Sequence, residues 1–317
     1  MRVVLYLLIV GVMISGDPVR VSAANLDSNT SKRIALSFDD APKGAGPRFS
    51  GDERAVVLID ALESVAAGPV VFFIKTSNFE RPGGRERVAR YADAGHLIAN
   101  HTHSHNWLKR TDANQYIEDI DQAEDLLQGF PNRRAWFRFP FLDEGTPREK
   151  RDAVRAALIE RGLMNGYVTV DNYDWYLDSK WKMAVDEGRK VNIDALRGVY
   201  VDMLMGAVTY FDDLAIESLD RSPAHVILLH ENDVAAMFIG DLITALRADG
   251  WSIVSPDEAY ADPVAKVVPK TLMTRQGHVG ALAVDAGVDP GTLTHLAIEE
   301  DQIDALLAER GVFGERK

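Results

Sequence analysis

Three histidines stand at alternate positions in the segment HTHSHNW: His101, His103 and His105. The whole chain holds only 8 histidines, so three of them within five residues mark this segment as a candidate metal or acid–base site. In a strand all three side chains would share one face, whereas in a helix only His101 and His105 would. The secondary structure therefore decides which of the three could act together.

The residues around the histidines favour the helical alternative. Asn100 is a good N-cap residue after an apolar run, so we expect residues 101–108 to begin a helical turn. Such a turn places His101 and His105 on one face and directs His103 away from them. Two imidazoles joined by one carboxylate form a common zinc-binding set that leaves a coordination position for water.

A pair of adjacent carboxylates could complete this set. Asp39 and Asp40 follow the apolar run of the segment SFDD, and neighbouring carboxylates repel one another unless a cation relieves them. One of them could bind a metal while the other accepts a proton from a water molecule. The alternative is a helix cap or a turn, which also favours aspartate.

The elements that must position these residues alternate along the chain. Short apolar runs predict strands, and longer segments with apolar residues at spacings of three and four predict helices between them. This alternation indicates an α/β fold, and about seven such units fit a distorted parallel (β/α)7-type barrel. The predicted strands are residues 34–38, 70–74, 96–100, 134–139, 165–170, 225–229 and 251–254, and the clearest helices are 53–67, 114–129 and 148–162.

Chemically active residues follow most of the predicted strands. Besides the Asp39–Asp40 pair and His101, the later strands are followed by or end near Arg138, Asp171 and His230. In parallel barrels the loops after the strands converge on one rim, where catalytic groups lie. We therefore expect these side chains to meet at one site, although solvated loops are also polar.

The composition restricts the environment and the partners. Residues 1–24 have one arginine near the start, a short apolar run and a small-residue ending, which predicts a secretory signal peptide; an uncleaved anchor is the alternative. With 0 cysteines, neither disulfides nor thiolates are available, so any metal must be held by His, Asp or Glu. The formal charge of −13 disfavours bulk binding to nucleic acid or to an anionic membrane. We expect a periplasmic or secreted protein with no membrane span after signal cleavage; the oligomeric state stays open.

Five short motifs in order resemble those of the polysaccharide deacetylases, the NodB-homology group also called carbohydrate esterase family four. The resemblance spans residues 32–260 and implies a barrel of about seven β/α units with a divalent metal, usually zinc, that removes acetyl groups from sugars. The motifs here are SFDD (37–40), HTHSH (101–105), RFPF (138–141), DNYDW (171–175) and LLH (228–230).

The resemblance assigns roles at the metal and at the base. Asp40, His101 and His105 resemble the three metal ligands, and Asp39 resembles the general base that takes a proton from the attacking water. Arg138 resembles the arginine that pairs with this base and orients it. His103 falls at a variable position of the family and is expected at the rim.

The remaining roles concern the leaving group and the substrate. His230 resembles the general acid, with Asp171 holding and tuning it. Trp175 and Leu228 resemble residues around the acetyl methyl group, and the backbone N–H of Phe141 resembles an oxyanion donor. Phe141 replaces the usual tyrosine, and the residue after the aspartate pair is Ala41 instead of the usual glycine.

These observations predict a signal peptide (1–24), a catalytic domain (25–260) and a short helical C-terminal extension (261–317). The leading function is metal-dependent removal of acetyl groups from an N-acetylated glycan such as chitin, peptidoglycan or an exopolysaccharide. An O-acetyl polysaccharide esterase is the nearest alternative. A catalytically silent glycan-binding barrel is another, although pure binding would not require a base, its orienting arginine and an acid together.

Overall fold

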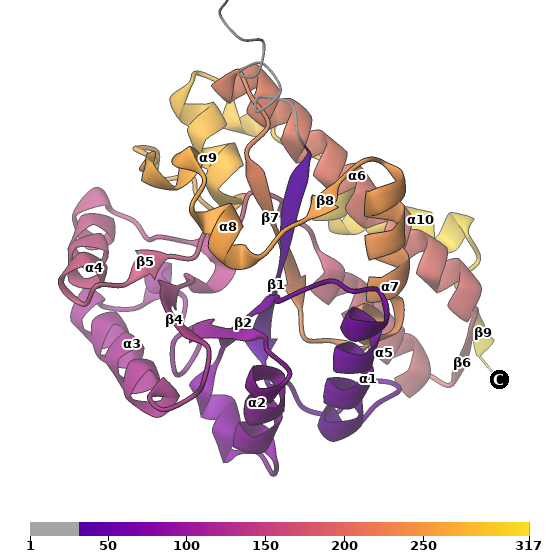
Figure 1. Ribbon diagram of the computed structural model, residues 1–317. Coiled ribbons are helices and arrows are strands. Elements are labelled where there is room, and N and C mark those ends of the chain that lie inside the picture. The colour runs from indigo at the N-terminus through magenta and orange to yellow at the C-terminus, as the bar shows by residue number, and fades with distance from the viewer. Residues whose placement is uncertain (1–31, 317) are drawn as a thin grey trace, which may run out of the picture.

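The computed structural model describes residues 32–316, which form a curved parallel sheet surrounded by helices (Figure 1). The predicted signal peptide, residues 1–24, lies outside the described residues. Within the described residues no helix is long and apolar enough to cross a bilayer.

The sheet has seven strands in the order β5-β4-β3-β2-β1-β7, with β8 pairing with the start of β1. Every pair within it is parallel, which confirms the predicted α/β class and distorted parallel barrel. The central strands read as nearly continuous apolar runs because both of their faces are covered. The strands are β1 (Arg33–Ala41), β2 (Val71–Ile74), β3 (Leu97–Asn100), β4 (Arg133–Phe137), β5 (Met164–Asn165), β7 (Ala224–His230) and β8 (Ser252–Ile253).

One bent segment connects the two edges of this sheet. Met164–Asn165 pairs with β4, and a few residues later Val170 forms a bridge to Ile227 of β7. The strand predicted over 165–170 is therefore split between two neighbours. Between its two parts, the carbonyl of Gly166 accepts a hydrogen bond from Arg138 Nε at 2.7 Å. The Arg138 side chain therefore contacts the segment between the two paired parts.

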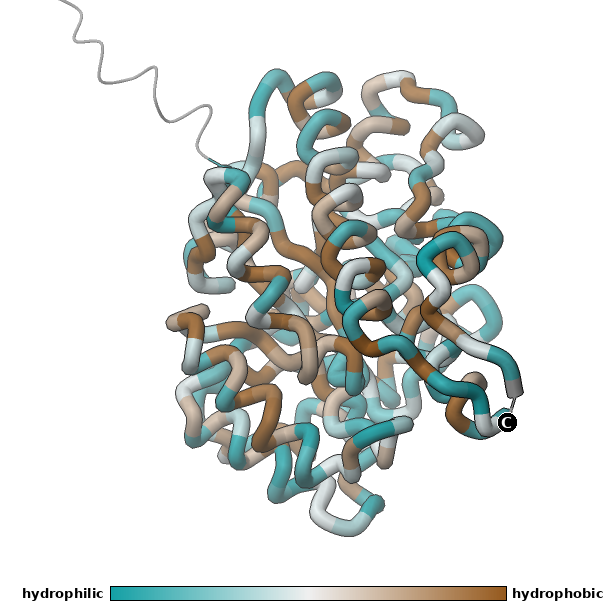
Figure 2. Tube along the Cα trace, turned by 90° about the vertical axis from the view of Figure 1, so that its right-hand side faces the viewer, coloured by the Kyte–Doolittle hydropathy of each residue, from teal (hydrophilic) through white to brown (hydrophobic). Residues whose placement is uncertain are grey.

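Helices cover the outside of the sheet, and the three predicted most clearly are confirmed with small shifts of their ends. The first begins at a capping box in which Ser50 and Glu53 satisfy each other's backbone N–H groups. Figure 2 shows hydrophobic segments running through the interior, with hydrophilic residues on outward-facing turns. The helices are α1 (Gly51–Ser64), α2 (Gly84–Asp93), α3 (Ala113–Leu127), α4 (Arg148–Glu160), α5 (Asp174–Asp186), α6 (Ile193–Leu219), α7 (Asp233–Ala248), α8 (Pro256–Tyr260), α9 (Gly277–Asp285) and α10 (Glu300–Glu309).

The predicted C-terminal extension packs onto the barrel along much of its length. Its helix α9 contacts α6, and the backbone N–H of His278 donates to the carbonyl of Val168 at 2.7 Å. Its final strand β9 (Phe313–Arg316) pairs antiparallel with β6 (Arg189–Val191), two strands that the sequence patterns did not predict. The extension thus contributes to the same hydrophobic core as the barrel.

Candidate active site

All predicted site residues except Arg138 line one cleft of about 810 Å³ at the carboxyl ends of the strands. β1 supplies Asp39 and Asp40, the loop after β3 supplies His101 and His105, and β7 ends in His230. The register between β1 and β2 is irregular here, and Asp40 has a left-handed backbone with φ of 66°. This irregularity interrupts the strand alternation, so that two successive carboxylates can line the same cleft.

Asp40, His101 and His105 form a compact set of possible metal ligands. Their donor atoms all lie within 4.8 Å of one another. His105 Nε2 lies 3.2 Å and His101 Nε2 3.9 Å from Asp40 Oδ1, a buried oxygen that has no hydrogen-bond partner. A buried carboxylate oxygen facing two imidazoles is a donor set that suits a divalent cation such as zinc.

The expected helical turn over residues 101–108 is wrong. Residues 101–107 form a loop, and only Leu108–Arg110 make a short 3-10 turn. The side chain of Asn100 accepts a hydrogen bond from the N–H of Thr102 at 2.7 Å, and Thr102 and His105 have left-handed backbones with φ of 64° and 62°. The loop nevertheless brings the rings of His101 and His105 within 4.9 Å.

His103 lies apart from this set. Its Nδ1 is 3.0 Å from Thr76 Oγ1, outside the compact group of donor atoms. His101 is oriented differently, because its Nδ1 donates to the carbonyl of Arg138 at 2.9 Å and its Nε2 faces the carboxylates. Burial lowers the pKa of His101 and of His105 to about 4, so both imidazoles are neutral near pH 7 and their free nitrogens can accept a cation.

Arg138 fixes the carboxylate of Asp39. Its Nη1 donates to Asp39 Oδ1 at 2.6 Å and to Ser37 Oγ at 2.8 Å, and its Nη2 donates to the Tyr260 hydroxyl at 2.9 Å. Arg138 is fully buried, and the ring of Phe73 lies 3.8 Å from its guanidinium carbon. The many contacts leave Asp39 a single well-defined orientation beside the metal-ligand set.

The two adjacent aspartates have opposite pKa shifts. Burial raises the pKa of Asp39 above its usual value despite the charge of Arg138. Burial acts on Asp40 as well, but the charges of His105, His230 and Lys43 outweigh it and hold the pKa of Asp40 far below the usual range. A more basic carboxylate thus lies next to a persistently anionic one, which are the properties required of a base and a ligand.

Asp174, and not Asp171, contacts the imidazole of His230. His230 Nδ1 donates to Asp174 Oδ1 at 2.6 Å, and the His230 N–H donates to Asp174 Oδ2 at 2.9 Å. The expected Asp171–His230 contact is therefore wrong, because Asp174 begins helix α5 and is aimed back at β7. Burial disfavours the charged imidazole, but Asp174 outweighs burial and raises the pKa of His230.

Asp171 lines the cleft, and among the described residues no other side chain forms an ion pair or hydrogen bond with its carboxylate. It is only 4% exposed, and burial raises its pKa to about 7. A hydrogen bond from the Asn172 backbone N–H and the nearby charges of His230 and Arg275 reduce this shift but do not cancel it. Asp171 is consequently a partly protonated carboxyl group in the cleft near neutral pH.

The three residues predicted to bind substrate also line the cleft. Leu228 is buried, whereas Trp175 and Phe141 are 38% and 49% exposed. The Phe141 ring lies 4.8 Å from that of His105, and Phe141 has a left-handed backbone with φ of 59°. Two exposed aromatic rings and a buried leucine give the cleft apolar surface next to the possible metal ligands.

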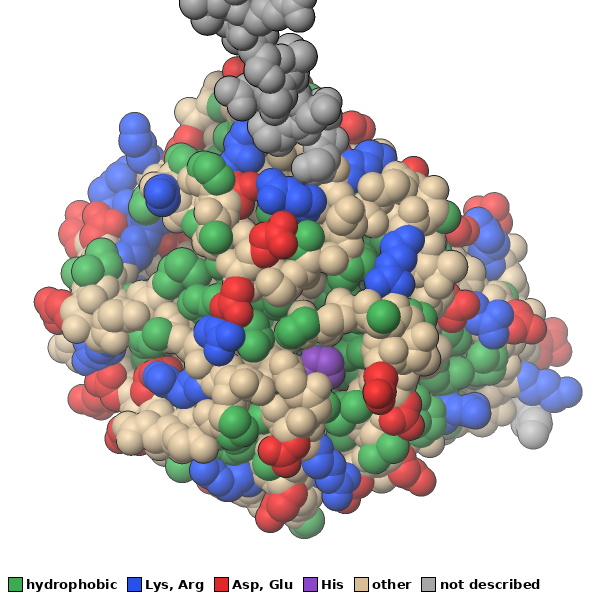
Figure 3. All heavy atoms as spheres, viewed as in Figure 1, with side chains coloured by type: hydrophobic (Ala, Val, Ile, Leu, Met, Phe, Trp, Pro, Cys, Tyr) green, Lys and Arg blue, Asp and Glu red, His purple; other side chains and the backbone are tan. Residues whose placement is uncertain are grey.

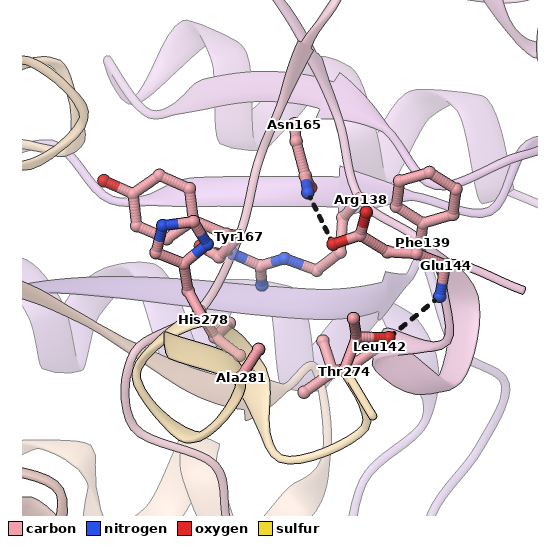
Figure 4. Close-up of a pocket in the computed structure, with 11 residues that line it drawn as sticks. Arg138, Phe139, Leu142, Glu144, Asn165, Tyr167, Thr274, His278 and Ala281 are labelled. Atoms are coloured by element: carbon pink, nitrogen blue, oxygen red, sulfur yellow. Dashed lines mark hydrogen bonds between the residues drawn. The ribbon is translucent and has the colours of Figure 1, made fainter. Parts of the chain in front are cut away.

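A small cavity lies behind Arg138, with room for about one water molecule (Figure 4). Across it, Asn165 Nδ2 donates to Glu144 Oε1 at 3.1 Å, and the Glu144 N–H donates to Thr274 Oγ1 at 3.1 Å. His278 stacks on Tyr167 with ring centroids 4.3 Å apart. Thr274 and His278 belong to the C-terminal extension, which therefore helps to form the surroundings of Arg138.

Sequence reasoning missed a buried ionic group beside His230. Arg54 of α1 pairs with Glu231 at 3.1 Å and with Asp233 at 2.8 Å, and these carboxylates also accept hydrogen bonds from backbone N–H groups of residues 43–49. The group therefore fixes the loop that forms one wall of the cleft. Arg54 stands four residues before the buried Leu58 on the apolar face of its helix, and this position was the available signal.

Comparison with known proteins supports the resemblance over part of the chain. Residues 27–160 match the sequence pattern of the polysaccharide deacetylase family, which confirms the predicted resemblance there. A peptidoglycan-N-acetylglucosamine deacetylase of Bacillus cereus is 28% identical over 142 residues, which cover 45% of this chain and 46% of that protein. The chain thus matches about half the length of this relative. Asp174 and His230 lie beyond the residues that match the family pattern.

Solved structures with similar architecture include deacetylases from bacteria and a fungus. A peptidoglycan deacetylase of Bacillus subtilis has 19% identity and a TM-score of 0.47, over 73% of this chain and 91% of that one. A family 4 carbohydrate esterase of Streptomyces lividans has 19% identity and a TM-score of 0.46, over 73% and 96%. The chitin deacetylase of Colletotrichum lindemuthianum has 18% identity and a TM-score of 0.46, over 73% and 88%.

Proposed function

We propose that this chain, whose residues 27–160 match the polysaccharide deacetylase family, is a metal-dependent hydrolase that removes acetyl groups from an N-acetylated glycan. The observation that carries the proposal is that one cleft contains two side chains able to transfer protons, and each is held in place by its own charged partner. Arg138 holds Asp39 and Asp174 holds His230, and both held side chains line the same cleft as the possible metal ligands.

Asp40, His101 and His105 would hold the metal, and their N and O donors and tight spacing suit zinc. A divalent cation there would supply a Lewis acid for the acetyl carbonyl and make a nearby water more acidic. The orphaned Oδ1 of Asp40 and the neutral imidazoles support this assignment.

Asp39 would act as the general base. Its raised pKa makes it a better proton acceptor than an ordinary aspartate, and Arg138 holds Oδ1 so that Oδ2 faces the site, 3.6 Å from His101 Nε2. The proton of the attacking water would pass to this carboxylate as the carbon–oxygen bond forms.

His230 would act as the general acid. Asp174 accepts its Nδ1–H, so the ring presents Nε2 to the cleft, and the raised pKa favours the protonated ring. An amine is a poor leaving group unless it is protonated, so a proton from Nε2 would allow the carbon–nitrogen bond to break. The products are acetate and a free amine on the sugar.

The apolar residues of the cleft suit an acetylated sugar. Leu228 and Trp175 would contact the acetyl methyl group, and the exposed faces of Trp175 and Phe141 could stack on sugar rings. The backbone N–H of Phe141 would donate to the developing oxyanion. We further propose that the protein is exported to the periplasm or secreted, as its first 24 residues predict.

Acetate release by the purified, zinc-loaded protein tests this function. We expect release from N-acetylated chitooligosaccharides or peptidoglycan, and loss of release in chelator with recovery on adding zinc. Release from acetylxylan alone would instead identify an O-acetyl esterase. Binding of glycan without any acetate release from these substrates would contradict the proposal and favour a silent binding barrel.

A further inference from the structure

We infer that the cleft takes an acetylated glycan that also carries negative charge, with carboxylate or phosphate groups on the acetylated sugar or on the sugars next to it. This inference rests on the proposed function and specifies its substrate class. It is based on four cationic side chains of the cleft, called the basic rim below: Lys43, Lys75, Arg81 and Arg275.

The basic rim lacks acidic partners. Among residues 32–316, none of its four side chains forms an ion pair or a side-chain hydrogen bond. Arg54 lines the same cleft and differs sharply, because Glu231 and Asp233 neutralise it. Unpaired cations beside one another repel, so their placement around one cleft favours an anionic ligand between them.

The cleft is much less acidic than the chain as a whole. The full chain has a formal charge of −13, whereas the cleft is lined by six lysines and arginines and five aspartates and glutamates. Two of the six cations, Arg54 and Lys182, are neutralised by carboxylates outside the lining, so the formal charge of the cleft is close to zero and a divalent cation would make it positive. On the face drawn in Figure 3, by contrast, acidic and basic side chains are interspersed over the surface.

The basic rim comes from separate segments of the chain that line the same cleft as the possible metal ligands. Lys43 follows β1, and Lys75 and Arg81 lie in the connection between β2 and α2. Arg275 comes from the C-terminal extension, and its guanidinium lies over the Trp107 ring at 5.3 Å. Four cations from separate segments suit a chain with repeated charges better than a single small anion.

Two observations describe how an acidic glycan would be held. The Trp107 ring that carries Arg275 lies 5.5 Å from the ring of Phe141, so a cation and an exposed aromatic surface adjoin each other. Arg81 packs against the backbone at Gly44, where an added Cβ would overlap its guanidinium. Sugar rings could stack on the aromatic surface while their charged groups reach the adjacent cations.

Another possible role for these cations is to balance the aspartates of the cleft. Burial raises the pKa of Asp178 and of Asp171, and the charges of Lys43 and Arg275, respectively, oppose this rise. The charge of Lys43 also helps to lower the pKa of Asp40. A purely balancing role predicts no preference between charged and neutral glycans. Direct binding measurements on the metal-free full-length protein therefore separate the two roles without relying on activity.

The test compares a hyaluronan tetrasaccharide, which alternates N-acetylglucosamine with a carboxylate sugar, with the neutral chitotetraose. A second pair, N-acetylglucosamine 6-phosphate and N-acetylglucosamine, shows whether phosphate is preferred to carboxylate. Calorimetry at low salt should give roughly tenfold tighter binding of at least one charged ligand than of its neutral counterpart. The preference should shrink as salt screens the charges.

Matched variants locate the effect. Arg81→Gln and Arg275→Gln should each weaken binding of the charged ligand about twofold to fivefold, as for exposed ion pairs, and leave the neutral ligand unchanged. Arg275→Lys should keep most of the binding. The control Lys190→Gln removes one charge from an exposed residue of β6 outside the cleft and should change neither.

Equal affinity for charged and neutral ligands, or equal losses for both in the variants, would overturn the inference. Acetate assays on chitooligosaccharides distinguish this failure from failure of the proposed function. If acetate is released but charge is not preferred, only the inference fails. If charged ligands bind tightly but no acetate is released from any substrate, the inference holds and the proposed function fails.

Discussion

The imidazole of His230 is held by the carboxylate of Asp174, which accepts its Nδ1–H at 2.6 Å and the His230 backbone N–H at 2.9 Å. Asp174 also accepts a hydrogen bond from Asn232 at 3.0 Å and is completely buried. Because the carboxylate can only accept, it fixes the ring tautomer and stabilises the charged ring.

Asp174→Asn should therefore lower kcat for acetate release by about a hundredfold or more, because the amide cannot stabilise the imidazolium. Asp171→Asn should cost much less, since Asp171 does not contact His230. The pH–rate profiles of both variants provide the measurement. The pKa assigned to His230, the proposed general acid, should fall in Asp174→Asn and stay raised in Asp171→Asn. An equal loss in the two variants would refute the distinction.

Asp39→Asn and Asp40→Asn should separate a base from a ligand. Asp39→Asn should keep metal affinity close to that of the unchanged protein but lower kcat about a hundredfold or more, and added zinc should not restore it. Asp40→Asn removes an anionic ligand, so metal affinity should fall first and activity should partly recover at high zinc. Metal stoichiometry and acetate release across a zinc titration measure both effects. Loss of metal in Asp39→Asn but not in Asp40→Asn would reverse these roles.

His103→Ala should leave zinc affinity and turnover near those of the unchanged protein, because His103 lies outside the compact donor set and near Thr76. His105→Ala removes a ligand and should lower zinc affinity by orders of magnitude. Competition with a chromogenic chelator measures both affinities. Comparable losses in the two variants would show that the loop binds metal through a different pair of histidines.

The periodic elements were predictable because their signals are local. Apolar runs specified most strands, and the capping box and apolar spacing specified α1. The convergence of His101 and His105 was also predicted, but for the wrong reason: a loop with left-handed residues brings them together instead of a helix. The side chain of Asn100 turns the chain here, and sequence alone does not separate this turn from an N-cap.

Contacts between distant segments were not predictable in the same way. Asp171 and Asp174 both occur in the DNYDW motif, and only the start of α5 and its packing against β7 decide which one reaches His230. Arg275 stands 104 residues beyond Asp171 in a segment without the family motifs, so nothing local placed it in the cleft. Such placements depend on tertiary packing, which the spacing of apolar residues along the sequence does not predict.

Asp171→Asn should stabilise the metal-free protein at pH 8 but not at pH 4. The pKa of Asp171 is raised to about 7 by burial, whereas in an unfolded chain it is about 3.9. The folded protein thus retains a proton that the unfolded chain releases, so stability falls as pH rises from about 4 to 7. Asparagine cannot ionise and removes this loss, a gain of up to a few kcal/mol. Urea unfolding at both pH values measures the difference, and a gain that does not grow with pH would refute the shift.

The C-terminal extension should unfold together with the barrel, because its side chains belong to the same core. Ile303 of α10 is completely buried in that core, whereas Ile159 of α4 is 77% exposed. Ile303→Ala should therefore lower the free energy of unfolding by about 2–5 kcal/mol, while the matched control Ile159→Ala should change it by about 0.5 kcal/mol or less. Urea unfolding followed both by tryptophan fluorescence and by circular dichroism measures the loss and its cooperativity.

A single shifted transition in Ile303→Ala is expected, because α9 and β9 connect the extension to α6 and β6. An early, separate transition that leaves the barrel signal unchanged would instead show that residues 261–317 unfold independently. Arg275 would then belong to a segment that can unfold while the rest of the cleft stays folded.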